Sequence, residues 1–307
     1  MLHIKTTPEQ RRKAFRDGLN SGKLLRFPGA IMPVVAMQIE QIGFDGVYIS
    51  GGVMANELGF PDLGITTMTE VTQKGYGIAR STNLPTIIDI DTGFGEPMSV
   101  ARTVVELTQL GLAGCHMEDQ IMPKRCGHLD NKEVVPTADM VRKIKAGVDA
   151  KPDPNFVLIA RTDARAVEGM DKTIDRIKAY VDAGADMIFP EAMRDERDFE
   201  AVRNAVDVPL LANMTEFGKS RLYTTEELTN LGYNMVIYPV TTLRLAMKAI
   251  EDGLTQILEE GTQENVVPMM QPRSRLYEVI HYEDYNEFDT GIFNFDLANN
   301  QGGKAAE

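Results

Sequence analysis

The sequence predicts an α/β protein of the (β/α)8 barrel type, with one extra helix before the barrel and a helical extension after it. Three observations lead to this prediction. Apolar, β-rich runs of strand length alternate with amphipathic helical stretches, which is the pattern of a parallel sheet covered by helices. Glycines stand where the helical stretches should stop, and one strand after another ends in a polar side chain. A length of 307 residues suits such a barrel.

The extra helix begins at Thr7-Pro8-Glu9-Gln10, which reads as a capping residue, a proline at the first helical position and a capping-box glutamine. We treat residues 1–307 as one domain. Within it, residues 1–28 hold this first helix, 29–261 form the barrel, and 262–307 form the extension, which we expect to dock on the barrel or to swap between subunits.

We expect the eight barrel strands at residues 30–35, 47–50, 86–91, 114–118, 156–161, 187–191, 208–214 and 235–239. Helices between and after them are expected at residues 99–110, 138–150, 170–183, 225–231 and 241–259. Gly111 and Gly184 follow two of these helices, where a glycine commonly ends a helix. A doubly wound open sheet is the competing architecture, but neither Gly93-Phe94-Gly95 nor Ser50-Gly51-Gly52 continues as a nucleotide-binding motif.

Composition limits the possible partners and the compartment. The formal net charge of -13 argues against nucleic acid or an anionic membrane as a partner, because both require basic patches. No apolar run approaches the length of a membrane span, and residues 1–13 are too polar for a secretory signal. Two cysteines are too few for a disulfide framework, and Cys115 is expected to be a buried thiol. We therefore expect a cytoplasmic protein.

Polar side chains gather at the ends of the predicted strands. They are Ser50, Asp89, Asp91, His116, Glu118, Arg161, Asp163, Glu191, Asn213, Thr215 and Tyr238. Active sites of (β/α)8 barrels are built at the carboxyl ends of the strands. A single one of these residues could be a helix cap or a rim salt bridge, but so many on one rim predict a catalytic site.

The carboxylates at this rim predict a metal site. Asp89 and Asp91 alternate on one strand, so their side chains are expected on the same face, and Glu118 ends the adjacent strand. Oxygen ligands favour Mg²⁺ or Mn²⁺ over zinc. His116 is either a further ligand or a neutral hydrogen-bond partner.

The loop Lys124-Arg125-Cys126-Gly127-His128 places a thiol among cationic side chains. Nearby cations stabilise a thiolate, so Cys126 is suited to proton transfer, and Gly127 permits close approach to a ligand. The alternative is a solvated basic loop with an incidental cysteine. Lys124, Arg125 and Arg161 supply positive charge for a small polycarboxylate substrate, with arginine best suited to bidentate binding.

These residues resemble the isocitrate lyase and phosphoenolpyruvate mutase superfamily, nearly from end to end. The most specific match is the Lys-Arg-Cys-Gly-His loop, and the chain is most similar to the members that cleave 2-methylisocitrate. Other matching segments are Tyr48-Ile49-Ser50-Gly51-Gly52, Pro61-Asp62-Leu63-Gly64, Asp89-x-Asp91-x-Gly93-Phe94-Gly95, His116-x-Glu118-Asp119-Gln120, Arg161-Thr162-Asp163, Phe189-Pro190-Glu191-Ala192 and Asn213-x-Thr215-Glu216-Phe217. The loop between Ser50 and Asp62 is one residue shorter than in the resembling sequences, which affects the contacts of Gly52 and Val53.

The resemblance implies a Mg²⁺-dependent retro-aldol cleavage of (2S,3R)-2-methylisocitrate to pyruvate and succinate, a step of propionate catabolism in the methylcitrate cycle. It implies Asp89, Asp91, Asp62 and Glu118 as metal ligands, with Mn²⁺ as a substitute metal. Cys126 would protonate the succinate carbanion, and the base for the 2-hydroxyl would be Tyr48 or a metal-bound water. It also implies a homotetramer.

The resemblance assigns the remaining site residues as well. Lys124 and His128 would join the catalytic group, and the substrate would be held by Ser50, Gly51, Gly52, Arg125, Gly127, Arg161, Glu191, Asn213, Thr215, Arg244 and Arg273. The substrate methyl group is expected against Phe189, Ile237 and Pro239.

Other activities stay open at this point. Isocitrate lyase and an oxaloacetate-type decarboxylase belong to the same superfamily. A Schiff-base aldolase would need a lysine at a strand end, and Lys124 lies on a loop instead. A non-catalytic tricarboxylate sensor would use the arginines and carboxylates but not Cys126.

Overall fold

The computed structural model describes residues 1–125, 127 and 131–295. Eight short parallel strands form its centre. They are β1 (Leu25–Pro28), β2 (Val47–Ile49), β3 (Thr86–Asp89), β4 (Gly114–Glu118), β5 (Val157–Thr162), β6 (Met187–Pro190), β7 (Leu211–Asn213) and β8 (Met235–Tyr238).

The strands pair in the order that a closed barrel requires. One run is β2-β3-β4-β5-β6 and the other is β1-β8-β7, and every pair in them is parallel. Single parallel bridges join the two runs, from Gly29 to Tyr48 and from Ile188 to Leu210. The ring of eight strands confirms the predicted barrel-type α/β fold.

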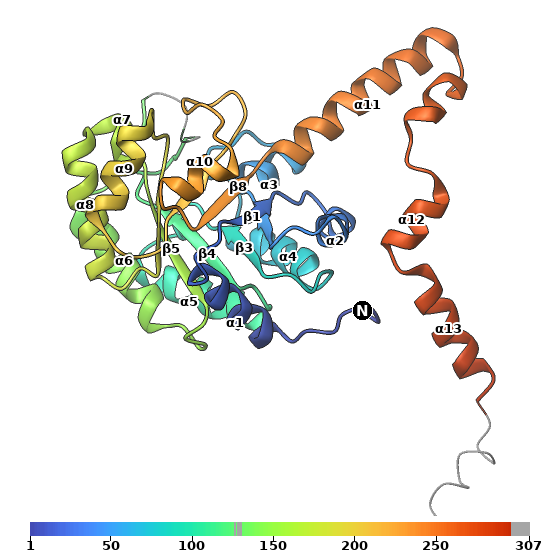
Figure 1. Cartoon of the computed structure of the whole chain (residues 1–307), viewed down its shortest axis with the longest axis horizontal. Coiled ribbons are helices and arrows are strands. Elements are labelled where there is room, and N and C mark those ends of the chain that lie inside the picture. Colours follow the sequence, from blue (N-terminus) through green and yellow to red (C-terminus); the bar gives the residue numbers. More distant parts are fainter. Residues whose placement is uncertain (126, 128–130, 296–307) are drawn as a thin grey trace, which may run out of the picture.

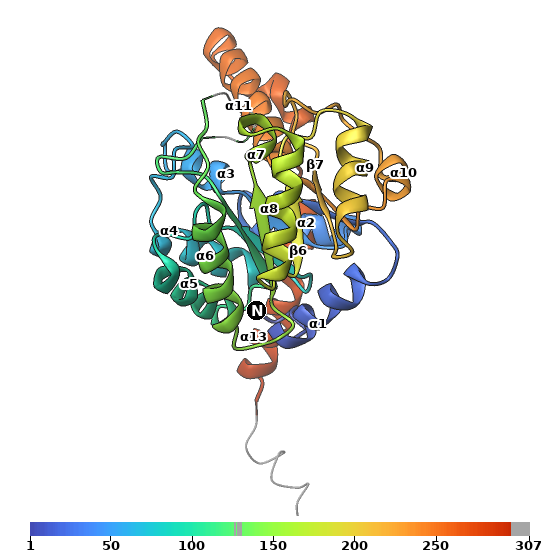
Figure 2. The same cartoon turned by 90° about the vertical axis from the view of Figure 1, so that its left-hand side faces the viewer.

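Helices surround this ring (Figure 1, Figure 2). They are α1 (Pro8–Leu19), α2 (Pro33–Ile42), α3 (Gly51–Glu57), α4 (Met68–Ala79), α5 (Pro97–Gln109), α6 (Thr137–Asp149), α7 (Ala164–Val167), α8 (Met170–Asp182), α9 (Glu196–Ala205), α10 (Thr225–Asn230) and α11 (Thr241–Glu260). A 3₁₀ turn η1 (Glu264–Met269) and the helices α12 (Arg273–Val279) and α13 (Tyr282–Phe293) complete the described chain. The five helices predicted from sequence agree with α5, α6, α8, α10 and α11 to within two residues at each end.

The first predicted strand, at residues 30–35, is wrong. The strand is β1, Leu25–Pro28, and Pro33 is instead the first residue of helix α2. Proline lacks an N–H and fits the first helical turn. The apolar residues after Pro33 follow helical periodicity, since Ala36, Met37 and Ile39 are the ones buried. The barrel therefore starts before residue 29, while the other seven predicted strands overlap observed strands.

Helix α1 covers the amino-terminal end of the barrel. Its capping box is present, with the Thr7 side chain accepting from the Gln10 N–H and the Gln10 side chain accepting from the Thr7 N–H. Phe15 and Leu19 of α1 join the apolar cluster inside the barrel. Arg12 donates to the carbonyl oxygens of Thr108 in α5 and of Leu112, which directly precedes strand β4. Because this end is covered, a ligand must approach the carboxyl end of the strands.

The carboxyl-terminal extension leaves the barrel as an arm. Helix α11 points away from the ring, and the chain then returns through α12 and α13 (Figure 1). Within one chain the arm contacts α2, where the Gln41 amide donates to the carbonyl oxygens of Glu278 and Val279 at 3.4 Å. Among the described residues, α11 and α13 have no buried side chain. In the same part of the chain, no helix combines the length and apolar character needed to cross a lipid bilayer.

Candidate active site

A cavity opens at the carboxyl ends of the strands. It is lined by Tyr48, Ser50, Gly52, Asp62, Asp89, Lys124, Gly127, Arg161, Phe189, Glu191, Asn213, Thr215, Pro239 and Val240. Most of the site residues predicted from the sequence therefore meet in one place. They come from loops or strand ends, which is where (β/α)8 barrels carry their chemistry.

Two aspartates lie against the first turn of α3. The Gly51 N–H donates to Asp89 Oδ2 at 3.2 Å, and a Cβ on Gly51 would lie 2.7 Å from Asp89 Oδ2 and 3.0 Å from Asp91 Oδ1. A Cβ on Gly52 would lie 3.0 Å from Asp62 Oδ2. Only glycine allows the backbone to come this close to three carboxylates. Both glycines are therefore needed for the geometry of the site.

Asp89 and Asp91 share this site for a reason other than the one predicted. Strand β3 ends at Asp89, so the two residues do not alternate along a strand. Asp91 instead has a φ of 47°, in the left-handed region. Its N–H donates to Asp89 Oδ1 at 2.9 Å, which ties the turn to the strand end. The turn brings the two carboxylates to the same side.

Lys124 reaches into the acidic cluster. Its ammonium pairs with the carboxylate of Asp62 and lies 2.8 Å from Asp91 Oδ1. Burial acts to lower the pKa of Lys124, but Glu118, Asp91 and Asp89 outweigh burial and raise that pKa. Burial also raises the pKa of Asp89 and of Asp91. Lys124 is thus a buried cation that offsets part of the crowded negative charge.

Arg161 is the second buried cation. Its guanidinium lies 3.0 Å from Glu118 Oε2, donates to Asp163 Oδ2 at 3.0 Å, and lies 3.8 Å from Glu191 Oε2. Burial raises the pKa of Glu118 well above its usual range, although Arg161 opposes this. Asn213 Nδ2 lies 3.4 Å from each carboxylate oxygen of Glu191. An anionic substrate would compete with these carboxylates for Arg161.

Tyr48 and His116 form a buried pair beside the cluster. The Tyr48 phenol oxygen lies 2.8 Å from His116 Nε2, and His116 Nδ1 lies 3.6 Å from Asp89 Oδ1. Burial raises the pKa of Tyr48 well above its usual range, and burial lowers the pKa of His116 to about 3. His116 is therefore neutral and Tyr48 is a protonated phenol at neutral pH, which fits the predicted role of His116 as a hydrogen-bond partner.

The acidic cluster suits a divalent cation in its donor chemistry. Asp62, Asp89, Asp91 and Glu118 offer carboxylate oxygens, and Glu118 Oε1 has no hydrogen-bond partner among the described residues. Hard divalent cations prefer such oxygens. No three His, Cys, Asp or Glu side chains within the described ranges stand in ligating positions as they are. The Lys124 ammonium pairs with two of the carboxylates, so a metal ion there would replace part of that pairing.

Four predicted substrate ligands do not line the cavity, namely Gly51, Arg125, Arg244 and Arg273. Arg125 is exposed, and its backbone N–H donates to Gln120 Oε1 at 2.9 Å. The Arg244 side chain is 48% exposed, 3.6 Å from Glu216 Oε2. Arg273 is exposed at the start of α12. Cys126 and His128 lie outside the described residues.

The apolar wall expected for the substrate methyl group is formed in part. Phe189 and Pro239 line the cavity, whereas Ile237 is buried inside the barrel and does not. The Phe189 ring packs edge-on against His116 at 5.3 Å and under the Arg161 guanidinium at 5.2 Å. Phe189 is thus fixed by two polar residues of the site.

One buried residue at this end was not predicted. Lys132 is 7% exposed, lies 2.7 Å from Asp163 Oδ1, and also donates to the Gly127 carbonyl oxygen. The sequence around it is polar and resembles a solvated loop, so no pattern separates Lys132 from surface lysines. Only its position six residues after Cys126 connects it with the site.

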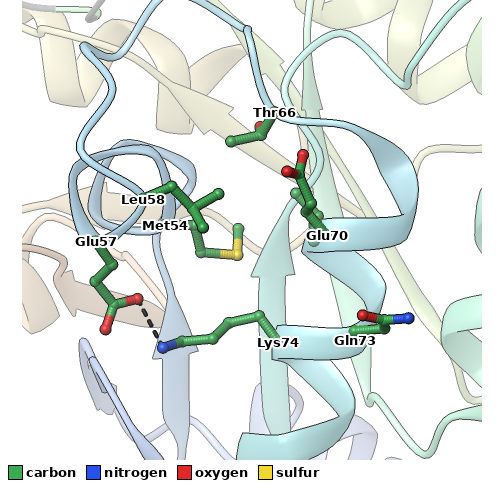
Figure 3. Close-up of a pocket in the computed structure, with 8 residues that line it drawn as sticks. Met54, Glu57, Leu58, Thr66, Glu70, Gln73 and Lys74 are labelled. Carbon is green, nitrogen blue, oxygen red and sulfur yellow. Dashed lines mark ion pairs between the residues drawn. The ribbon is translucent and has the colours of Figure 1, made fainter.

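A second, larger cavity lies between α3 and α4 (Figure 3). It measures about 430 Å³ and contains none of the predicted site residues. Two of its charged side chains pair with each other, because Lys74 Nζ lies 2.8 Å from Glu57 Oε2 (Figure 3). The convergence of buried charges is at the strand ends instead, and we place the active site there.

Comparison with known proteins agrees with this architecture. Residues 15–258 match the family model described as phosphoenolpyruvate phosphomutase. A solved oxaloacetate acetylhydrolase in complex with 3,3-difluorooxalacetate superposes with a TM-score of 0.87 and 36% identity, over 98% of this chain and 100% of that one. A 2,3-dimethylmalate lyase, described as a PEP mutase/isocitrate lyase superfamily member, gives a TM-score of 0.85 and 30% identity, over 95% and 100%. The chain belongs to this superfamily.

The sequence relatives are more specific. A probable 2-methylisocitrate lyase 1 of Corynebacterium glutamicum is 58% identical over 93% of this chain and 94% of its own length. The 2-methylisocitrate lyase of Escherichia coli is 45% identical over 92% and 96%. A phosphonopyruvate hydrolase with oxalate and Mg²⁺ bound is more distant, with a TM-score of 0.84 and 29% identity over 93% of this chain and 99% of that one. Within the superfamily, this chain groups with carbon–carbon lyases.

Proposed function

We propose that this enzyme cleaves (2S,3R)-2-methylisocitrate into pyruvate and succinate. The observation that carries the proposal is the acidic cluster of Asp62, Asp89 and Asp91 beside two buried cations, Lys124 and Arg161. This combination suits a substrate with several carboxylates and a hydroxyl group. The relatives named 2-methylisocitrate lyase, at 43–58% identity, support this substrate over others of the superfamily.

In the proposed reaction the 2-hydroxyl loses its proton, the C2–C3 bond breaks, and its electron pair stays on the succinate carbon. Arg161 and Lys124 hold the substrate carboxylates, since both are buried cations at the cavity. Asn213 and Thr215 line the same cavity and would orient the substrate. Cys126, which lies outside the described residues, donates the proton that completes succinate.

The resident metal in this proposal is Mg²⁺, with Mn²⁺ able to replace it. Asp89 and Asp91 would hold it, with Asp62 and Glu118 acting partly through water. When bound, it supplies Lewis-acid polarisation of the hydroxyl and carboxylate of the substrate. The close approach of Gly51 and Gly52 to these carboxylates supports a compact cation site.

Tyr48 contributes a hydrogen bond in this proposal. Its raised pKa keeps the phenol protonated at neutral pH. The phenol contacts His116 and borders the cavity, so it can orient the substrate hydroxyl. A protonated phenol is a poor base, which leaves a metal-bound water as the other candidate base for the 2-hydroxyl.

The assembly and the compartment are part of the same proposal. Large apolar side chains are exposed along the arm, including Leu254 at 61%, Leu258 at 87% and Phe293 at 88%. Exposed apolar surface of this extent fits an interface with further copies of the chain. We propose a cytoplasmic homotetramer, in which Arg273 reaches a neighbour's cavity, and no nucleic-acid or membrane partner.

Product identification tests the function. The purified protein is incubated with 2-methylisocitrate and Mg²⁺, and the products are followed by ¹H NMR. Pyruvate and succinate should appear in equal amounts. An unchanged substrate spectrum would contradict the proposal and favour another acid of the superfamily.

A further inference from the structure

Lys132 is buried next to the active site, although lysine is rarely buried without a specific partner. Its side chain is 1% exposed, and its ammonium lies 2.7 Å from Asp163 Oδ1. The same ammonium donates to the carbonyl oxygen of Gly127. Lys132 therefore connects the backbone of the loop that carries the proposed acid with a fixed carboxylate at the end of β5.

Asp163 is held from several sides. Its N–H donates to Asp119 Oδ1 at 2.9 Å, and Asp119 also accepts from the hydroxyls of Thr162 and Tyr180 at 2.7 Å each. Burial acts to raise the pKa of Asp163, but Arg161 and Lys132 outweigh it and lower that pKa to about 2. Asp163 is thus an ionised anchor with little freedom to move.

Asp163 binds two cations with different positions in the site. Its Oδ2 accepts from Arg161 Nε at 3.0 Å, and its Oδ1 accepts from Lys132. Arg161 lines the cavity, whereas Lys132 does not. The carboxylate therefore fixes the guanidinium and the Gly127 carbonyl oxygen relative to each other.

Gly127 itself is packed without spare room. A Cβ there would lie 2.4 Å from Glu191 Cγ and 2.5 Å from Arg161 Nη2. Its backbone is thus in contact with two side chains of the cavity wall. A small displacement of Gly127 would change its position relative to both side chains, and errors near 1 Å in a reacting geometry can cost about a hundredfold in rate.

We propose that Lys132 is a positioning residue for the proposed cleavage, because its bridge between Asp163 and the Gly127 carbonyl oxygen fixes Gly127 against Arg161 and Glu191. The inference rests on the proposed function for its kinetic consequence. Its geometric part concerns Gly127 alone and can be measured without substrate.

The test compares Lys132→Met, which keeps most of the length of the side chain and removes the charge, with wild type. Lys145→Met is the matched control, since Lys145 is 60% exposed on α6 and pairs only with Asp149 among the described residues. We expect kcat of Lys132→Met on 2-methylisocitrate to fall about a hundredfold, with KM changing by less than about fivefold. Lys145→Met should keep both constants. If Lys132 only stabilised the fold, its replacement would lower the thermal unfolding midpoint but would not lower kcat selectively while KM stays nearly constant.

Limited proteolysis supplies the second measurement. Trypsin cleavage after Arg125, two residues before Gly127, is compared with cleavage after Arg102 in the middle of α5 by mass spectrometry. Loss of the bridge should raise cleavage after Arg125 by at least about tenfold and leave cleavage after Arg102 unchanged. An equal rise at both bonds would indicate general unfolding and overturn the inference, as would a kcat within about threefold of wild type.

If Lys132→Met does not fold, Lys132→Gln, which keeps a hydrogen-bond donor, undergoes the same two measurements with the same criteria. If wild type releases no pyruvate from 2-methylisocitrate, the proposed function fails. The ratio of the two tryptic cleavages then decides whether Lys132 positions Gly127.

Discussion

The phenol oxygen of Tyr48 lies 2.8 Å from Nε2 of His116, and both side chains are buried. His116 is neutral, so only one of its ring nitrogens carries a proton. His116 Nδ1 lies 3.6 Å from Asp89 Oδ1, and a proton on Nδ1 would leave Nε2 to accept from the phenol of Tyr48. The aromatic pair thus links the strand end of β2 to the acidic cluster and fixes the direction of the phenol.

The first prediction concerns the charge of His116. Burial lowers its pKa to about 3, so its imidazole signals should not titrate between pH 5 and pH 9 in ¹H–¹⁵N NMR. The signals that disappear in His116→Gln are those of His116, so this variant assigns them. A midpoint near pH 6.5 for the His116 signals would contradict a neutral, buried ring.

The sign of the linked stability change follows from the same pKa. The unfolded chain binds a proton at His116 below about pH 6.5, whereas the folded chain does so only near pH 3. The contribution of His116 is therefore complete above pH 6.5 and is lost as pH falls, by about 1.4 kcal/mol per pH unit of the free energy of unfolding. Urea titrations of wild type and His116→Gln, with chelator present, should differ in this slope.

The second prediction is that turnover depends on a divalent metal. Exhaustive chelation should abolish pyruvate release, and Mg²⁺ or Mn²⁺ should restore it. Asp89→Asn should be inactive because a neutral amide is a poor ligand for a hard cation. Its single amide oxygen can accept from only one of the Gly51 and Asp91 N–H groups, which donate to different oxygens of Asp89, so circular dichroism must confirm that the variant is folded. Asp149→Asn, on the exposed face of α6, is the control and should behave as wild type. Full activity after chelation would remove the metal from the account.

The third prediction compares two glycines in helices. A Cβ on Gly51 would meet Asp89 Oδ2 at 2.7 Å, whereas a Cβ on Gly77 of α4 would meet nothing within 4 Å. Gly77→Ala should therefore stabilise the fold by about 0.5–1 kcal/mol and leave activity unchanged. Gly51→Ala should reduce kcat/KM by at least about a hundredfold because the carboxylates must move. Equal activity of the two variants in steady-state assays would show that the first turn of α3 does not shape the site.

The fourth prediction concerns Cys126 as the proton donor. Cys126→Ser keeps nearly the same size but has a far weaker acid, so kcat should fall by about 10²–10⁴-fold while substrate still binds. Cys115 is fully buried in the core, so Cys115→Ala serves as the thiol control and should retain most of its activity. Turnover of Cys126→Ser within about tenfold of wild type would exclude the thiol as the acid.

Much of the fold could be predicted from the sequence because helices and strands differ in the period of their apolar residues. Five helices in the second part of the chain, α5, α6, α8, α10 and α11, were predicted to within two residues at each end, whereas α9 was not predicted. The first strand was missed because Pro33 follows an apolar stretch that suits either structure. Sequence periodicity alone cannot separate a short buried strand from the first turn of a buried helix.

The sequence could predict which residues lie at the site but not which of them contact one another. Strand ends that carry Asp89, Glu118 and Arg161 converge because all strands are parallel. The left-handed turn at Asp91 and the bridge from Lys132 depend on contacts between segments far apart in sequence, or on a local backbone angle. A polar loop sequence does not distinguish such a buried lysine from a solvated one. Arg273 also requires tertiary information, because it is exposed at the start of α12 and does not line the cavity of its own barrel.

The measurement that tests the central claim most directly is kcat/KM for 2-methylisocitrate and for isocitrate, with pyruvate, glyoxylate and succinate quantified separately. The substrates differ by one methyl group, for which a pocket such as the one beside Phe189 supplies about 1–3 kcal/mol. We predict that kcat/KM for 2-methylisocitrate exceeds that for isocitrate by at least about tenfold. Glyoxylate formed from isocitrate as fast as pyruvate from 2-methylisocitrate would contradict this assignment and identify isocitrate as an equal substrate.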